Sequence, residues 1–490
     1  MSAGGVGLRG EADRLLVAEG LSAARDFVEA HLLQEPGDAP AWRLLAELHR
    51  KDDDCASGLD ALDKALALVP GDAGATLYRA QMLLDAGLPA VDAFAAAARL
   101  DATSGTARLG LAGALLAEGD GEKADSLIAQ GVANEPGWVE GQAYLAKLRW
   151  MLGDPDHVRA FDQALAARPH DVALWLNRIA LEMQADDHAR ALELVEQAEQ
   201  ATGPQAHWIA HRAACLDELG QQEAAGAAFG QLGMPTEPTL AVRMVRHRLR
   251  IGDAQGAFGL AEPWLKTPAA GNLWPYVSLA WRMLGDTRAD WLEANPKLVG
   301  IYDIGPSLGD LGALADRLRA LHHLKRQPID QSLRGGTQTD GYLLTRLEPE
   351  FRKLRAVLAE TVAAHIAQLG TRDPFHPTLR HRRDRPVAFS GAWSVRLAGG
   401  GYHVSHVHPL GWFSSALYIA LPEPAADDPQ AGWLALGEAE KGLGLSLPPL
   451  RTVEPKPGRL VLFPSTMWHG TRRFGIGERL TVAFDVTPPA

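Results

Sequence analysis

The stretch "YHVSHVHPLGW", residues 402–412, holds three of the chain's 17 histidines. Side chains of a β-strand point alternately to opposite faces. The spacing therefore puts His406 and His408 on one face and predicts that His403 points to the other. Two imidazoles two positions apart on a strand can bind one metal ion, and His469, which follows another predicted strand in "LVLFPSTMWHGT", can supply a third ligand.

An arginine lies ten residues after His469, at the start of the predicted strand "RLTVAFDV". Arg479 shares a face of that strand with Thr481, and a guanidinium can hold a carboxylate through two parallel hydrogen bonds. Tyr418, in the strand pattern "FSSALYIALP", can donate a further hydrogen bond to such a carboxylate or simply pack inside a barrel. Asp485 lies on the same face as Arg479 and is a conceivable internal partner for it.

These side chains lie in a region of short, nearly alternating apolar runs that begins at about residue 376. Many short strands separated by glycine- and proline-rich turns are typical of a β-sandwich or barrel. Upstream, residues 311–326 and 347–369 are predicted to be helical. Between them "QSLRGGTQTDG" fits no helix or strand period and is predicted to be a loop, and "AGGG" at 398–401 is predicted to be a hairpin turn.

The first 290 residues follow a different pattern, in which prolines recur on a grid of 33–34 residues. The prolines on this grid are Pro36, Pro70, Pro136, Pro169, Pro235 and Pro268, and the tryptophans that follow it are Trp42, Trp175, Trp208 and Trp274. Each period contains two helical patterns and resembles the tetratricopeptide repeat. Such repeats stack into a superhelix with a concave groove, and the regular tryptophans are predicted to pack in its core.

The two histidines of "HVH", the distant histidine and the arginine beyond it together resemble the Fe(II)- and 2-oxoglutarate-dependent dioxygenases. The stretches "SGAWSVRL", "HVHPLGWFSSALYIALP", "PGRLVLFPSTMWHGT", "ERLTVAFDV" and "QPIDQSLRGGTQT" are similar to a bacterial branch of that family, some members of which are fused to tetratricopeptide repeats. The resemblance covers about residues 320–490. It implies that His406, His408 and His469 bind Fe(II), and that Arg479, with Thr481 beside it, binds the distal carboxylate of 2-oxoglutarate.

The expected organisation therefore has three parts. Residues 1–290 form an α-solenoid of tetratricopeptide repeats, residues 291–375 form a linker and helical lead-in, and residues 376–490 form an all-β double-stranded β-helix, or jelly roll, which carries the oxygenase site. The expected activity is hydroxylation of a protein, a peptide or another substrate recruited by the repeats.

One departure from the family pattern keeps two alternatives open. The usual ligand set is two histidines and a carboxylate, and here His408 occupies the carboxylate position. Three neutral imidazoles suit iron, but also zinc, copper or nickel. The chain could instead be a non-catalytic interaction scaffold with a structural metal site, or a cupin-like three-histidine metalloenzyme that does not use 2-oxoglutarate. The amount of succinate formed per oxygen consumed separates these alternatives.

Composition limits the partners and the location. The net charge of −12 argues against a general nucleic-acid binder. The sequence contains no run of 18 apolar residues, so no membrane span is expected. Only two cysteines are present, Cys55 and Cys215, which fits a reducing compartment and predicts a cytoplasmic protein. A protein or peptide partner is expected on the repeat groove, and self-association is left open.

Overall fold

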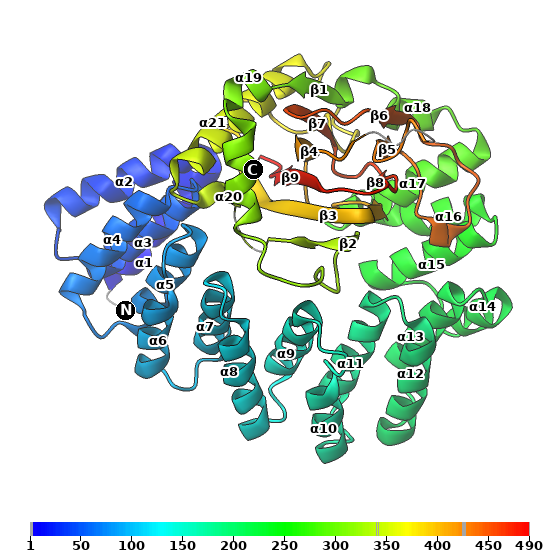
Figure 1. Ribbon diagram of the computed structural model, residues 1–490, viewed down its shortest axis with the longest axis horizontal. Helices are drawn as coiled ribbons and strands as arrows, with labels where there is room; N and C mark the ends of the chain where they lie inside the picture. The colour runs from blue at the N-terminus through cyan, green and yellow to red at the C-terminus, as the bar shows by residue number, and fades with distance from the viewer. Residues whose placement is uncertain (1–2, 340, 342, 424–427, 490) are drawn as a thin grey trace.

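The computed structural model describes residues 3–339, 341, 343–423 and 428–489. Figure 1 shows a curved array of helical hairpins that bends around a curled antiparallel sheet. Both the first helices of the array (blue) and its last helices (green) lie beside the carboxyl-terminal part of the chain. The predicted fold class, an α-solenoid followed by an all-β domain of the jelly-roll kind, is confirmed.

The helices of the array and of the segments that follow it have these bounds. They are α1 (Ala3–Ala18), α2 (Leu21–Gln34), α3 (Ala39–Lys51), α4 (Cys55–Leu68), α5 (Ala73–Asp85), α6 (Val91–Leu100), α7 (Gly105–Ala117), α8 (Gly121–Asn134), α9 (Val139–Leu152), α10 (Arg159–Ala167), α11 (Val172–Gln184), α12 (His188–Thr202), α13 (Ala206–Glu218), α14 (Gln222–Gly230), α15 (Pro238–Arg250), α16 (Ala254–Ala261), α17 (Ala270–Leu284), α18 (Arg288–Glu293), α19 (Gly305–Leu308), α20 (Leu311–Arg319) and α21 (Pro349–Gln368). Short 3-10 helices are η1 (Glu262–Trp264), η2 (Pro296–Leu298), η3 (Leu343–Thr345) and η4 (Lys441–Leu443).

Local capping explains where several repeat helices begin. The side chains of Asp38, Asp72 and Asp171 each accept a hydrogen bond from the backbone N–H three residues further on. Such a cap satisfies one of the N–H groups that the first helical turn leaves without a partner. The aspartate two residues after Pro36, Pro70 and Pro169 therefore marks the start of the next hairpin.

The tryptophans of the grid have a structural role that also explains their spacing from the prolines. The indole N–H groups of Trp42 and Trp175 donate to the carbonyl oxygens of Pro36 and Pro169, each at 2.9 Å. Trp175, Trp208 and Trp274 are buried, as predicted. The indole ring packs between hairpins, and the hydrogen bond from its N–H stabilises the turn that precedes its own helix.

Nine strands of the described residues form one sheet in the order β1-β7-β4-β9-β3-β8-β5-β6, with β2 paired to β3 beside this path. The strands are β1 (Gly300–Asp303), β2 (Leu333–Gln338), β3 (Phe389–His406), β4 (Phe413–Ala420), β5 (Leu434–Leu436), β6 (Arg451–Val453), β7 (Arg459–Pro464), β8 (His469–Thr471) and β9 (Arg479–Val486). The apolar runs predicted as strands after residue 376 are confirmed.

Three local predictions were wrong. The predicted loop "QSLRGGTQTDG" contains β2, which pairs with β3; its position 340 lies outside the described residues. The "AGGG" stretch is not a turn but part of the long strand β3, where Gly400 takes a left-handed φ of 81°. The predicted helix 311–326 ends at Arg319, as α20. In both glycine-rich stretches long-range pairing overrides the local turn preference.

Alternation along β9 separates the core of the domain from a cavity. Val482 and Phe484 pack on one face of the sheet, in a core that includes Phe351 and Leu358 of α21. Side chains at the intervening positions, from Arg479 to Asp485, line a cavity inside the curl of the sheet. None of the helices in the described ranges is long and apolar enough to cross a membrane.

Candidate metal centre

Three imidazoles from two neighbouring strands converge inside the sheet. His406 at the end of β3 pairs in register with His469 at the start of β8, and their ring centroids are 4.1 Å apart. The ring of His408 lies 5.1 Å from each of the other two. One ring nitrogen of each histidine lies within 4.8 Å of the others. The sequence prediction that these three side chains meet agrees with this geometry.

A hydrogen bond at Nδ1 sets the orientation of each ring. His406 Nδ1 lies 2.8 Å from the carbonyl oxygen of Val404, and His469 Nδ1 lies 3.0 Å from that of Met467. His408 Nδ1 lies 2.5 Å from a carboxylate oxygen of Asp485. Because these acceptors require an N–H at Nδ1, each ring turns the lone pair of Nε2 toward the other two, which is the form that binds metal.

The surroundings favour the neutral form of the His406 and His469 rings. Burial, reinforced by the neighbouring His469 ring, holds the pKa of His406 well below its ordinary value. Burial and the nearby His408 ring do the same to the pKa of His469. A proton therefore does not compete strongly for the nitrogens at neutral pH, and the cluster is ready to accept a cation.

Arg479 lines the same cavity and lacks an internal anion. Arg479 is only 3% exposed, and its guanidinium donates a hydrogen bond to the carbonyl oxygen of Gly432, at 2.5 Å. No carboxylate pairs with it anywhere in the described part of the chain. Burial lowers the pKa of Arg479 from its ordinary value. A buried, charged guanidinium is costly without a counterion, so this end of the cavity is suited to an anion.

Tyr418 and Thr481 surround Arg479 with further polar groups. The two residues are opposite each other in the β4–β9 register, and Thr481 lines the cavity. Tyr418 is fully buried, its ring lies 5.1 Å from the Arg479 guanidinium carbon, and its hydroxyl has no hydrogen-bond partner within the described residues. An orphaned hydroxyl beside an unpaired guanidinium points to a polar ligand that satisfies both.

Asp485 does not pair with Arg479, although the two share a strand face. Its carboxylate contacts His408 and also accepts a hydrogen bond from the Ser414 hydroxyl at 2.6 Å. The conceivable Arg479–Asp485 pair is therefore absent, because six residues of extended strand separate the two side chains by about 20 Å.

His403 does not point away from the other histidines, and that prediction was wrong. The β3–β8 register shifts between His403 and His406, and an irregularity of this kind turns the side chain to the other face. The His403 and His406 rings stack with their centroids 5.9 Å apart, and His403 lines the cavity. Burial, with the nearby Arg479, lowers its pKa to about 3. It lies outside the set of three nitrogens that are close enough to share one ion.

Sequence reasoning missed the contribution of the segment before β2. The Ser332 hydroxyl lies 3.1 Å from His403 Nδ1 and 3.2 Å from His406 Nε2, and Gln331 lines the cavity beside it. The signal was present in "QPIDQSLRGGTQT", which shares the family resemblance but offers no period to place its side chains.

The donor set fits a metal ion and an acidic co-substrate. Three imidazole nitrogens face one another, and the same cavity offers a buried guanidinium and an orphaned tyrosine hydroxyl. Imidazole clusters of this kind bind iron and other first-row transition metals. The cation site, on and beside β3 and β8, and the anion site, on β9, line the same cavity, as a chelating dicarboxylate requires.

Residues 391–485 match the model of the family described as "Putative 2OG-Fe(II) oxygenase". The match runs from β3 to β9 and includes His406, His408, His469 and Arg479. The part of the chain from β3 to β9 is therefore similar to the oxygenase domain of that family. No curated protein matches the chain.

Similar solved structures are repeat proteins. One is a tetratricopeptide repeat protein from Parabacteroides merdae ATCC 43184, with 16% identity over 49% of this chain and 96% of that chain, and a TM-score of 0.31. Another is yeast Tom70, with 14% identity over 56% of this chain and 60% of that chain, and a TM-score of 0.38.

Proposed function

We propose that the chain is an Fe(II)- and 2-oxoglutarate-dependent dioxygenase that hydroxylates a protein or peptide substrate. The observation that carries the proposal is Arg479, a buried guanidinium without a carboxylate partner among the described residues, in the cavity of the three imidazoles. A purely structural metal site has no need of such a group.

Each side chain has a defined part in this proposal. His406, His408 and His469 hold the metal through Nε2, and their Nδ1 partners fix the rings. Arg479 and Tyr418 bind the distal carboxylate of 2-oxoglutarate, and Thr481 lines its path. Iron, when bound with 2-oxoglutarate, supplies the oxidation by oxygen that yields succinate, carbon dioxide and a hydroxylated product. The protein contributes position and exclusion of water.

The direct test is a calorimetric titration of 2-oxoglutarate into the anaerobic, Fe(II)-loaded protein. Loss of one member of a buried charge pair costs about 2–5 kcal/mol, so Arg479→Ala should weaken binding by at least roughly tenfold. Iron binding should survive, because no ligand nitrogen is lost. Arg396→Ala is the matched control, since that arginine is exposed and paired with Glu478. Equal affinities for wild type and Arg479→Ala would remove the basis of the proposal.

The second candidate is a three-histidine metalloenzyme that does not use 2-oxoglutarate. It is favoured by one observation, the imidazole of His408 in the place of the usual carboxylate. Succinate formed in proportion to oxygen consumed supports the dioxygenase, whereas oxygen consumption without succinate supports the alternative.

We also propose that the repeat array recruits the substrate. Part of its face toward the sheet is already covered by the chain itself, because Ile329 is buried in the solenoid core and Lys147 pairs with Asp330 at 2.7 Å. A partner would therefore use the neighbouring hairpins. The cytoplasm is the proposed location, supported by the free, buried thiols of Cys55 and Cys215.

A further inference from the structure

Among the three imidazoles, His408 alone is backed by a charged group. The Nδ1 atoms of His406 and His469 contact backbone carbonyl oxygens, whereas that of His408 contacts the Asp485 carboxylate at 2.5 Å. His408 is also the residue that stands where the related dioxygenases have a carboxylate ligand. In this chain a carboxylate, that of Asp485, thus contacts the far nitrogen of His408, the imidazole that takes the place of the usual carboxylate ligand.

The carboxylate is held firmly in this place. The Ser414 hydroxyl donates to its second oxygen at 2.6 Å, and the Ser465 hydroxyl lies 2.9 Å from that of Ser414. Ser414 and Asp485 are register partners across β4 and β9. On the other side, the Trp393 ring stacks on His408 with an interplanar angle of 22°. Both the acid and the imidazole are therefore fixed before any metal arrives.

Asp485 differs from two other acids on or beside the sheet, because no arginine or lysine pairs with it in the part of the chain that the structure describes. Glu478, which precedes β9, pairs with Arg319 and Arg396, and Asp303 pairs with Arg459. A mostly buried carboxylate that has no arginine or lysine partner carries a charge that a cation in the site would balance. Within the described residues, strand β9 therefore carries an arginine without a carboxylate partner at one end and a carboxylate without an arginine or lysine partner at the other, both facing one cavity.

We propose that Asp485 is a positioning residue that supplies, through His408, the negative charge which a directly bound carboxylate would give the metal. The proposal rests on the metal site of the proposed function. An imidazole that donates its N–H to a carboxylate is a more basic, more anionic ligand than one that donates to a carbonyl. With Asp485 included, the site and a divalent ion carry the same total charge as a site of two histidines and one carboxylate.

The test is the affinity of the full chain for Fe(II) alone, and for Co(II) alone, under anaerobic conditions without 2-oxoglutarate. Asp485→Asn keeps the shape and an acceptor oxygen but removes the charge. Loss of such a partner typically weakens metal binding about 10–100-fold. The Fe(III)/Fe(II) midpoint potential should also become more positive, because less negative charge stabilises Fe(III). Glu478→Gln is the matched control and should change neither quantity.

A second background separates this role from a structural one. In His408→Asp the carboxylate enters the site directly, and Asp485 then faces a like charge. There Asp485→Asn should leave Co(II) affinity unchanged or raise it. Ser414→Ala, which only loosens Asp485, should give a smaller loss than Asp485→Asn in the wild-type background.

Equal Fe(II) affinity and equal potential in wild type and Asp485→Asn would overturn the proposal, as would the same fold-loss in both backgrounds. These readouts use metal alone, so they stay decisive if 2-oxoglutarate does not bind. Failure of 2-oxoglutarate binding would instead contradict the proposed dioxygenase function, and the proposal for Asp485 would still be decided by the metal affinities and the potential.

Discussion

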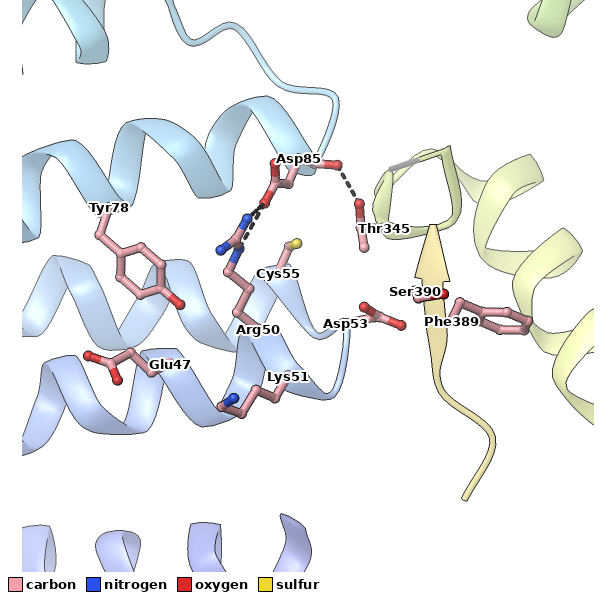
Figure 2. A pocket seen from close by; sticks show the side chains of 10 residues that line it. All are labelled: Glu47, Arg50, Lys51, Asp53, Cys55, Tyr78, Asp85, Thr345, Phe389 and Ser390. Carbon is pink, nitrogen blue, oxygen red and sulfur yellow. Dashed lines mark hydrogen bonds and ion pairs between the residues drawn. The ribbon is translucent and has the colours of Figure 1, made fainter. Parts of the chain in front are cut away.

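At its two ends the helical array meets the sheet domain through seams that are built differently. The amino-terminal seam, where α3–α5 face the segment from η3 to α21 and the start of β3, is polar and borders an open pocket of ≈ 410 Å³. Figure 2 shows the side chains that line this pocket. The carboxyl-terminal seam, where α15–α17 meet β8 and the segment around η4, has polar contacts too, such as the Arg246–Glu440 ion pair, but adds a shared apolar core to them. The difference shows which end of the array serves the metal site.

Hydrogen bonds and charges hold the amino-terminal seam. Arg50 pairs with Asp85 at 2.6 Å, and the Thr345 hydroxyl donates to the backbone oxygen of Asp85 at 2.7 Å (Figure 2). Arg355 of α21 reaches Asp53 at 3.1 Å. None of these residues is a sequence neighbour of a metal ligand. This seam closes the ring of helices without touching the site.

The carboxyl-terminal seam instead contacts residues that are next to the metal ligands in the sequence. Trp468, next to His469, is 2% exposed and donates its indole N–H to the carbonyl oxygen of Pro275 in α17, at 3.0 Å. Val407, between the other two ligands, packs against the same core. Gly271 of α17 approaches the backbone of Pro409 so closely that an added Cβ would lie 2.0 Å from its oxygen. Packing against α17 and the core around it therefore holds the backbone next to all three imidazoles in place.

The largest expected effect comes from removing the anchor of the carboxyl-terminal seam. Trp468→Ala should lower the free energy of unfolding by about 3–5 kcal/mol and weaken Co(II) binding, because His469 loses its support. Chemical denaturation and Co(II) titration measure the two effects. Trp42→Ala, in the first repeats, is the control and should leave Co(II) affinity unchanged. Unchanged affinity in Trp468→Ala would mean that the seam does not support the site.

A single methyl group at the same seam should have the next largest effect. Gly271→Ala brings a Cβ against the Pro409 backbone, and overpacking of this kind costs about 1–3 kcal/mol. The displaced strand should also weaken Co(II) binding through His408. Gly259→Ala in the preceding helix α16 is matched, because an added Cβ there has no neighbour within 4 Å, and it should be slightly stabilising. Similar melting temperatures for the two variants would contradict the close approach.

A smaller effect is expected at the amino-terminal seam. Thr345→Val removes the hydrogen bond to Asp85 and should cost about 0.5–1.5 kcal/mol, while Thr345→Ser keeps the hydroxyl and should cost less. Neither variant should change Co(II) affinity, since this seam touches no ligand. A change in affinity would show that the two seams are coupled, and the contrast between them would be lost.

The smallest effect concerns pH. Burial raises the pKa of Asp53 despite the nearby Arg355, so the folded chain favours the protonated acid. Wild type should therefore lose stability as the pH rises from the ordinary carboxyl range through the raised folded value. Asp53→Asn does not ionise, and asparagine tolerates the left-handed φ of 56° at this position. The variant should match wild type near pH 3 and exceed it at neutral pH by under about 1 kcal/mol. Lower stability at neutral pH would mean that the Arg355 pair outweighs burial.

Local pattern predicted the strands, the solenoid and the convergence of His406, His408 and His469, because period and spacing determine which face a side chain takes. It failed at His403, where a shifted register in a glycine-rich strand reverses the face. It also left the partner of Asp485 undecided, since strand register and not sequence distance brings Ser414 and His408 to it.

The contacts at the two seams could not be predicted from the sequence pattern. Trp468 and Pro275 are 193 residues apart in the chain, and no composition or period links them. The sequence places the domain boundary near residue 290, where the repeat grid ends. Because α17 packs against Trp468 and Val407, we propose that in the finished fold the helices from Ala270 onward form one packed unit with the sheet.

The order of these contacts along the chain has a consequence for synthesis in the cell. A ribosome makes α17 long before it makes Trp468 and His469, and amino-terminal parts generally fold first during translation. The emerging strands therefore meet a surface that is already formed, and Val407 and Trp468 can dock on it in turn. The ligand cluster, and with it Arg479 and Asp485, is completed only when β9 is inserted between β4 and β3. Iron would thus be loaded after translation, into a scaffold that the helices have already shaped.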